Sequence, residues 1–176
     1  MTGSGLTLAQ LAGAKRLSVP FLQSLGVTED SWSGKPRIRI PYPDEDGSIV
    51  SIRYRYSLDG DARFQWRKGD HVLPYGLPRL RDAYKLGWIL LVEGESDCWT
   101  FWHYGQPALG IPGKDTWQSD WAGFLKRRDL KVYLWMEPDA ITLVAHVAAD
   151  LPDLLVIKAP IWAKDVNDVH VKRCAP

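Results

Sequence analysis

Five acidic residues of this 176-residue chain follow three apolar segments, close to the point where each segment ends. They are Glu93 after residues 89–92, Glu137 and Asp139 after residues 132–136, and Asp165 and Asp168 beyond residues 154–158. Carboxylates at neighbouring strand ends repel one another unless a cation lies between them. Oxygen ligands suit Mg²⁺ or Mn²⁺, which take one or two carboxylates, several waters and a substrate phosphate. The pattern therefore predicts a Mg²⁺ or Mn²⁺ site suited to phosphoryl transfer.

Each acid taken alone has a simpler explanation, because an acidic residue after a buried strand is often only a solvent-exposed side chain or the cap of the next helix. Three acidic positions along one sheet edge favour the metal site instead, since ligands of parallel sheets bind outside the carboxyl ends of the strands.

The elements that position these acids alternate from Trp88 onward. We expect strands at 88–92, 107–111, 130–136 and 154–158, and helices at 96–104, 117–128, 140–149 and 166–172. Such alternation predicts an α/β fold with a mainly parallel sheet flanked by helices over residues 87–176.

Residues 1–86 are expected to form a smaller α+β lobe. Its elements are a helix at 6–12, a helix capped by Ser18 and closed by Gly26, a hairpin of 37–42 and 48–56 around a turn at 44–47, and a third strand near Phe64 and Trp66. Alternating polar and apolar residues around an Asp-Gly turn are typical of a hairpin.

Basic and aromatic residues of this lobe are candidates for binding nucleic acid. Arg37, Arg39, Arg53 and Arg55 are expected on one face of the hairpin, where they would contact phosphates or form an ordinary charged surface. Trp66, Arg67 and Lys68 combine a stacking ring with cations, although Trp66 would equally close the core of the lobe. Lys114 beside Gly113 is a candidate for a nucleotide phosphate, or a solvated lysine.

Several of these segments resemble a known family. Glu93-Gly94-Glu95-Ser96-Asp97 is similar to the Glu-Gly-x-x-Asp motif of Toprim domains, and Val132–Asp139 takes the place of their second motif, a strand ending in Asp-x-Asp. Pro107–Gly113 matches the strand and glycine loop between the two. Lys164-Asp165-Val166-Asn167-Asp168 resembles the Lys-Asp-x-Asn-Asp element of bacterial-type replicative primases.

Upstream segments extend the resemblance to about residues 36–170. Arg37–Tyr42, Asp46-Gly47, Ile52–Arg55 and Leu73–Leu77 look like the segment that precedes Toprim in primases. They favour a primase over the topoisomerases, recombination-mediator proteins and OLD-family nucleases, which share only the Toprim domain.

The resemblance implies a primase that makes short primers on single-stranded DNA from nucleoside triphosphates. It implies that Glu93 is the catalytic acid or base with Asp97 as its auxiliary, that Glu137 and Asp139 bind Mg²⁺ (or Mn²⁺) together with Glu93, and that Asp165 and Asp168 are additional acids. Because no zinc-binding module precedes the core and no Gly-x-x-x-x-Gly-Lys-Ser/Thr loop is present, we expect either a fragment or a separate polypeptide that works with a replicative helicase.

The second motif departs from the family pattern. Glu137 replaces the first Asp, Pro138 lies between the acids, and Ala140-Ile141 follows where a small residue or glycine is usual. Since Mg²⁺ demands strict geometry, a degenerate Toprim module that only binds single-stranded DNA or a nucleotide stays an alternative, and so does a Toprim nuclease.

The composition limits the classes of protein to which the chain can belong. Hydrophobic residues make up 45% and charged residues 24%, as in globular domains, and a net charge of +1 does not by itself predict a polyanionic partner. Cys98 and Cys174 lie too far apart for a zinc motif, and no apolar run reaches about 18 residues. We expect a cytoplasmic protein with no membrane partner.

Overall fold

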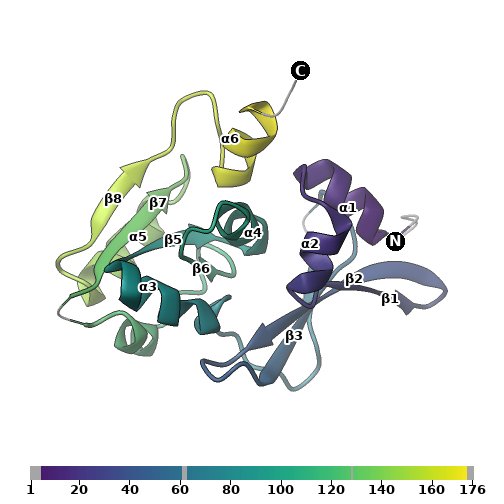
Figure 1. Ribbon diagram of the computed structural model, residues 1–176, viewed down its shortest axis with the longest axis horizontal. Coiled ribbons are helices and arrows are strands. Elements are labelled where there is room, and N and C mark those ends of the chain that lie inside the picture. The colour runs from purple at the N-terminus through teal and green to yellow at the C-terminus, as the bar shows by residue number, and fades with distance from the viewer. Residues whose placement is uncertain (1–4, 61–62, 128, 174–176) are drawn as a thin grey trace.

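The computed structural model describes residues 5–60, 63–127 and 129–173, and these form two four-stranded sheets with helices (Figure 1). The first part contains α1 (Leu8–Lys15), α2 (Val19–Ser24), β1 (Thr28–Trp32), β2 (Lys35–Pro43), β3 (Ile49–Arg55), β4 (Phe64–Trp66), η1 (Leu77–Arg79) and α3 (Leu80–Leu86). The second contains β5 (Trp88–Glu93), α4 (Glu95–His103), β6 (Ala108–Ile111), η2 (Ser119–Phe124), β7 (Lys131–Met136), α5 (Ile141–Asp150), β8 (Leu155–Lys158) and α6 (Val166–Arg173).

The first sheet is antiparallel, in the order β1-β2-β3-β4. The predicted hairpin is confirmed as β2 and β3, and the third strand as β4. Strand β1 was not predicted, because its sequence Thr-Glu-Asp-Ser-Trp is mostly polar and exposed. Such a sequence suits an edge strand that pairs on one side only.

The second sheet is parallel throughout, in the order β6-β5-β7-β8. One face packs against α3, η2 and α5 through an apolar cluster that includes Leu80, Leu134 and Leu143. The other face packs against α4, α6 and the first lobe. The α/β fold class predicted from the sequence, a mainly parallel sheet flanked by helices with a small α+β lobe, is confirmed.

The helix predicted for residues 117–128 is wrong in type. The chain there forms the short 3-10 helix η2 over Ser119–Phe124. Gly123 lies inside this segment, and a glycine in a helix interior costs about 1 kcal/mol relative to alanine. The apolar side chains Trp121 and Leu125 are nevertheless buried. The sequence pattern therefore indicated the buried side chains correctly but predicted the wrong type of helix.

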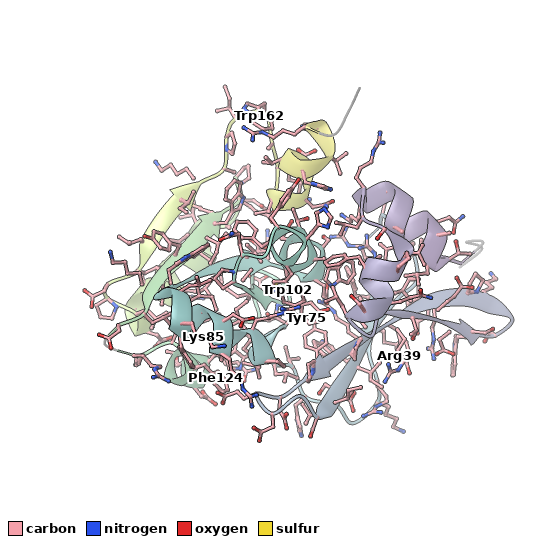
Figure 2. The ribbon with its side chains drawn as sticks, in the orientation of Figure 1. Arg39, Tyr75, Lys85, Trp102, Phe124 and Trp162 are labelled. Atoms are coloured by element: carbon pink, nitrogen blue, oxygen red, sulfur yellow. The ribbon has the colours of Figure 1, made fainter. Side chains whose placement is uncertain are left out.

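The two lobes share one hydrophobic core. Tyr42 of the first sheet lies in the same buried cluster as Leu90 of β5 and Trp99 of α4. The Trp99 indole donates a hydrogen bond of 2.8 Å to the Tyr75 hydroxyl, and Tyr75 lies beside Trp102 at the junction of the lobes (Figure 2). The division between residues 86 and 87 stays a prediction.

Within the part of the chain that the structure describes, no helix is both long and apolar enough to cross a membrane. Cys98 is buried with a free thiol, and Cys174 lies outside the described residues.

Candidate active site

A cavity of about 630 Å³ lies where the carboxyl ends of β5 and β7 meet the first lobe and the start of α6. Its acids are Asp59, Glu93, Glu95, Asp97, Glu137, Asp139, Asp165 and Asp168. Its bases are Lys15, Arg53, Arg55, Arg63, Lys114 and Lys164. The cavity therefore brings together the acidic residues that the sequence placed at strand ends, and adds a set of cations.

Glu93 is the last residue of β5, and Gly94 turns the chain from that strand into α4. Gly94 has φ of 84° and ψ of 178°, a conformation that is essentially limited to glycine. Its N–H donates to the Ile111 carbonyl at 2.8 Å, which ties the turn to β6. The glycine of the motif is therefore required by the backbone that presents the Glu93 side chain to the cavity.

The Glu93 carboxylate has an unused oxygen. Its Oε1 is buried and has no hydrogen-bond partner within the described residues. Burial, followed by the negative charge of Asp139, raises the pKa of Glu93. A buried acceptor without a partner costs about 1–3 kcal/mol, so this oxygen is set up to receive a cation or a proton.

Glu137 lies close to Glu93 across the ends of the neighbouring strands β5 and β7. Burial, then the charges of Glu93 and Asp165, raise the pKa of Glu137 to about 8. Neighbouring carboxylates raise one another's pKa in this way, and a cation bound between them would relieve the repulsion. The longer arm of a glutamate thus still reaches the cavity despite the departure from Asp.

Asp139 lines the same cavity but is more exposed than Glu93 and Glu137. Its carboxylate is mostly exposed and accepts a 2.7 Å hydrogen bond from the Lys114 ammonium. This contact lowers the pKa of Asp139. Lys114 and Asp139, predicted to bind a nucleotide and a metal respectively, are therefore brought together at the cavity rim as an ion pair.

Asp97 and Asp165 cap the start of α6. Asp97 is fully buried and accepts the N–H of Asn167 at 2.8 Å, and Asp165 accepts the N–H of Asp168 at 2.7 Å. Burial and the charge of Asp165 raise the pKa of Asp97 well above its ordinary value. Asp168 pairs with Lys172 at 2.8 Å. These acids hold α6 against the cavity, and their predicted chemical roles stay predictions.

The arginines of the hairpin do not share one face, which corrects the expectation. Residues directly opposite in an antiparallel pair point to the same side, and Arg55 lies opposite Ile38 whereas Arg39 lies opposite Tyr54. Arg53 and Arg55 therefore face the cavity, and Arg37 and Arg39 face the outside. The reason is the period of two along a strand, which puts the flanking Ile38 on the core side.

Arg53 and Arg55 are joined at the cavity by cations that the sequence analysis did not single out. Lys15 comes from the end of α1, Arg63 from the loop before β4, and Lys164 from the loop before α6. The Lys-Asp-x-Asn-Asp resemblance would have pointed to Lys164. No local pattern marks Lys15 or Arg63.

The remaining basic and aromatic candidates divide between core and surface. Trp66 packs edge-on against Tyr42, with ring centroids 4.7 Å apart, and lies under Arg53. Arg67 pairs with Asp70 at 3.0 Å, and Lys68 is exposed. Trp66 thus contributes to the core of the lobe, which was the alternative to base stacking that its sequence position allowed.

Glu95 is a site residue that the sequence analysis quoted but gave no role. Its carboxylate is buried, accepts the Tyr42 hydroxyl, and forms an ion pair with Arg53 at 2.9 Å. Burial raises the pKa of Glu95, but the Arg53 charge and the Tyr42 hydrogen bond outweigh it, so the pKa is lowered. Glu95 therefore ties α4 to both strands of the hairpin.

A divalent metal fits this donor set in part. No group of three His, Cys, Asp or Glu side chains among the described residues is arranged to hold an ion by itself. Mg²⁺ needs fewer protein ligands, because one or two carboxylates suffice when water and substrate phosphates complete its coordination shell. The carboxyl groups of Glu93 and Glu137, which lie at this end of the cavity, would be the two ligands of such an ion.

The raised pKa of Glu137 predicts a pH-dependent stability. A folded-state pKa of about 8, against an ordinary 4.5, favours the protonated carboxyl in the folded protein. The stability it contributes is present below pH 4.5 and is lost as the pH rises to about 8. We expect Mg²⁺ to bind more tightly and to stabilise more as the pH rises through this window, because only the carboxylate binds metal.

Urea unfolding at a series of pH values, with EDTA or with Mg²⁺, checks this expectation. Glu137→Gln should weaken the pH dependence and leave the part that comes from Glu93 and Asp97, whose pKa values are also raised. Asp153→Asn, an exposed acid away from the cavity, should leave it unchanged. A Glu137→Gln protein with the wild-type pH profile would contradict the assignment.

Comparisons with known proteins bear on the fold. No family model matches the chain. The gene 57 protein of Mycobacterium phage D29 is 28% identical over 141 residues, which are 75% of this chain and 88% of that protein. The primase fragment of the bacteriophage T7 primase-helicase superposes with a TM-score of 0.70 at 21% identity, covering 97% of this chain and 69% of that one.

The DnaG primase catalytic domain bound to single-stranded DNA superposes with the same TM-score, 0.70, at 14% identity, covering 95% of this chain and 67% of that one. At these identities the likeness establishes the fold. The fold predicted from the resemblance to Toprim primases is confirmed.

Proposed function

We propose that this chain, which has the fold of bacterial and phage primase catalytic cores, is a metal-dependent primase that works in the cytoplasm and joins nucleotides into short primers on single-stranded DNA. The observation that carries the proposal is the cavity in which the carboxylates of Glu93 and Glu137 lie opposite the cations of the first lobe. Nucleotidyl transfer needs both, because a triphosphate brings negative charge and the attacking hydroxyl must lose a proton.

Glu93 is proposed as the general base. Its Oε1 has no hydrogen-bond partner among the residues that the structure describes, and its raised pKa lies nearer to neutral pH, where a base transfers protons most effectively. It would take the proton of the primer 3′-hydroxyl as that oxygen attacks the α-phosphorus and pyrophosphate leaves. A divalent ion bound by Glu137, and by the oxygen of Glu93 that does not take the proton, would supply positive charge to the phosphates.

The cations of the cavity would bind the triphosphate of the incoming nucleotide. Arg53 is held by its ion pair with Glu95, and Arg55 by donating to the carbonyls of Ser57 and Leu58 at 2.9 and 2.8 Å. Guanidinium groups held in this way bind phosphate oxygens at little further entropic cost. Lys114 would join them when a phosphate displaces Asp139 from its ammonium, or when a metal ion binds the Asp139 carboxylate instead.

The template is proposed to be single-stranded DNA, as in the DnaG domain solved with that ligand. A replicative helicase is the proposed partner, because the T7 relative is the primase fragment of a primase-helicase. Both assignments are carried over from those proteins to this one.

A second candidate function rests on Asp139. Its carboxylate pairs with Lys114 at 2.7 Å, a contact that competes with binding a metal. The alternative is therefore a module that binds single-stranded DNA or a nucleotide without catalysis. Calorimetric titration of Mg²⁺ separates the two functions. Metal binding that is lost in Glu137→Gln would support the primase, whereas the absence of metal binding to the wild type would support the binding module.

The proposed activity is tested by incubating the protein with single-stranded DNA, labelled nucleoside triphosphates and Mg²⁺ or Mn²⁺. We expect short labelled products that require the metal and the template, and that EDTA abolishes. Products that form without template would contradict the proposal. Nicking of plasmid DNA without nucleotides would instead indicate a Toprim nuclease.

A further inference from the structure

The face of the first sheet that points away from the cavity carries aromatic and basic side chains. In the antiparallel register, Asp30 lies opposite Arg37, Trp32 opposite Lys35, and Arg39 opposite Tyr54. We call Trp32, Lys35, Arg37, Arg39 and Tyr54 the outer aromatic face. The intervening residues Ile38 and Ile40 point to the other side, into the core shared with α1 and α2.

Arg37 organises this face and is itself held rigidly. Its guanidinium donates twice to one oxygen of Asp30, at 3.0 and 2.7 Å, and once to the Tyr56 hydroxyl at 3.0 Å. The guanidinium carbon lies 3.5 Å from the centroid of the Tyr54 ring and 5.0 Å from that of Trp32. The result is a preformed array of rings and a cation spanning β1, β2 and β3.

Trp32 is the exposed member of the array. Its side chain is 60% exposed, although indole is the largest apolar group among the side chains. It already contacts a cation on one side, so its orientation is partly fixed before any ligand arrives. The face of a fixed, exposed indole is suited to stacking on a planar group.

The charges beside Trp32 favour an anionic ligand. Lys35, Arg37 and Arg39 contribute three positive charges to this face, and Asp30 offsets one of them through Arg37. Within the described residues, neither Lys35 nor Arg39 has an ion pair. An exposed ring beside unpaired cations is the combination that binds single-stranded nucleic acid, since a base stacks on the ring and the phosphates pair with the cations.

We propose that the outer aromatic face is a second binding site for single-stranded nucleic acid, with a base stacked on Trp32 and phosphates at Lys35 and Arg39. This site lies on the opposite side of the sheet from Arg53 and the cavity, so it would hold a strand at a distance from the reacting groups. This inference rests on the proposed function only in taking the bound nucleic acid to be the template for primer synthesis. The binding itself does not depend on that function.

The experiment measures the affinity for a short fluorescein-labelled oligo-dT by fluorescence anisotropy. Stacking of one base is worth about 1–3 kcal/mol by alanine substitution, so Trp32→Ala should weaken binding at least about fivefold. Trp32→Phe keeps a ring and should bind within about twofold of the wild type. Arg39→Ala should reduce the slope of log affinity against log salt concentration by about 0.7.

Trp162→Ala is the matched control. Trp162 is also an exposed tryptophan, 48% accessible, and it lies in the loop before α6, far from Arg39 (Figure 2). It should bind oligo-dT like the wild type. Equal affinities for wild type and Trp32→Ala, or an equal loss in Trp162→Ala, would overturn the site. Glu93→Gln separates the two proposals, since it should lose primer synthesis and keep oligo-dT binding.

Discussion

Glu93→Gln is expected to lower the rate of primer synthesis by at least about 100-fold, the range that general acid–base catalysis contributes. The amide keeps the size of the side chain but cannot accept a proton from the 3′-hydroxyl. It also offers the metal a weaker ligand beside Glu137. The chain should remain folded, because Oε1 of Glu93 makes no hydrogen bond to the described residues that the substitution could break.

Primer synthesis on single-stranded DNA under saturating nucleotide and Mg²⁺ measures this effect. Glu45→Gln is the matched control, because Glu45 is an exposed glutamate in the turn between β2 and β3. It should retain full activity. A Glu93→Gln protein that makes primers at the wild-type rate would rule out the proposed base.

Glu95→Gln is expected to destabilise the fold by about 3 kcal/mol, the lower end of the cost of breaking a buried ion pair. The substitution leaves the Arg53 guanidinium mostly buried without its counter-charge, and weakens the acceptor of the Tyr42 hydroxyl. Because both partners belong to the first sheet and Glu95 belongs to α4, the loss falls on the contact between the lobes.

Urea denaturation checks this expectation, and Asp82→Asn provides the control. Asp82 also pairs with an arginine, Arg79, but at 3.7 Å and with both side chains about half exposed. Exposed pairs of this kind contribute about 0–1 kcal/mol, so the free energy of unfolding should change little. Equal effects of the two substitutions would show that the Glu95 pair has no special role.

Glu93 and Glu95 illustrate how one short motif serves two purposes. The glycine between them turns the chain at the end of β5, so that Glu93 keeps a free oxygen toward the cavity while Glu95 is fully engaged between the lobes. A mutational study that treats both as catalytic acids would mix a chemical effect with a structural one. Their different responses to activity and stability assays separate these roles.

The N-terminal arginines show where sequence reasoning reached its limit. Alternation predicted the hairpin correctly, but four arginines were expected on one face. Two of them, Arg37 and Arg39, have odd numbers on β2 and point outward, while Arg53 and Arg55 point to the cavity. Whether the odd-numbered or the even-numbered residues of a strand face inward depends on the register of pairing. The turn sets this register, and composition does not reveal it.

The sequence by itself determined the alternation of strands and helices from Trp88 onward, apart from the type of η2, and the positions of the acids at strand ends. These follow from local periodicity and from turn residues such as Gly94, which act within a few residues of themselves. Parallel pairing then placed Glu93 and Glu137 at one edge, as expected from that order.

Only the tertiary structure decided what surrounds those acids. Tyr42 and Arg53 lie 53 and 42 residues from Glu95 along the chain, and they reach it because the two lobes share a core. The capture of Asp139 by Lys114 likewise depends on two loops that meet at the cavity rim. Contacts of this kind arise from packing between distant segments, and no local pattern of residues encodes them.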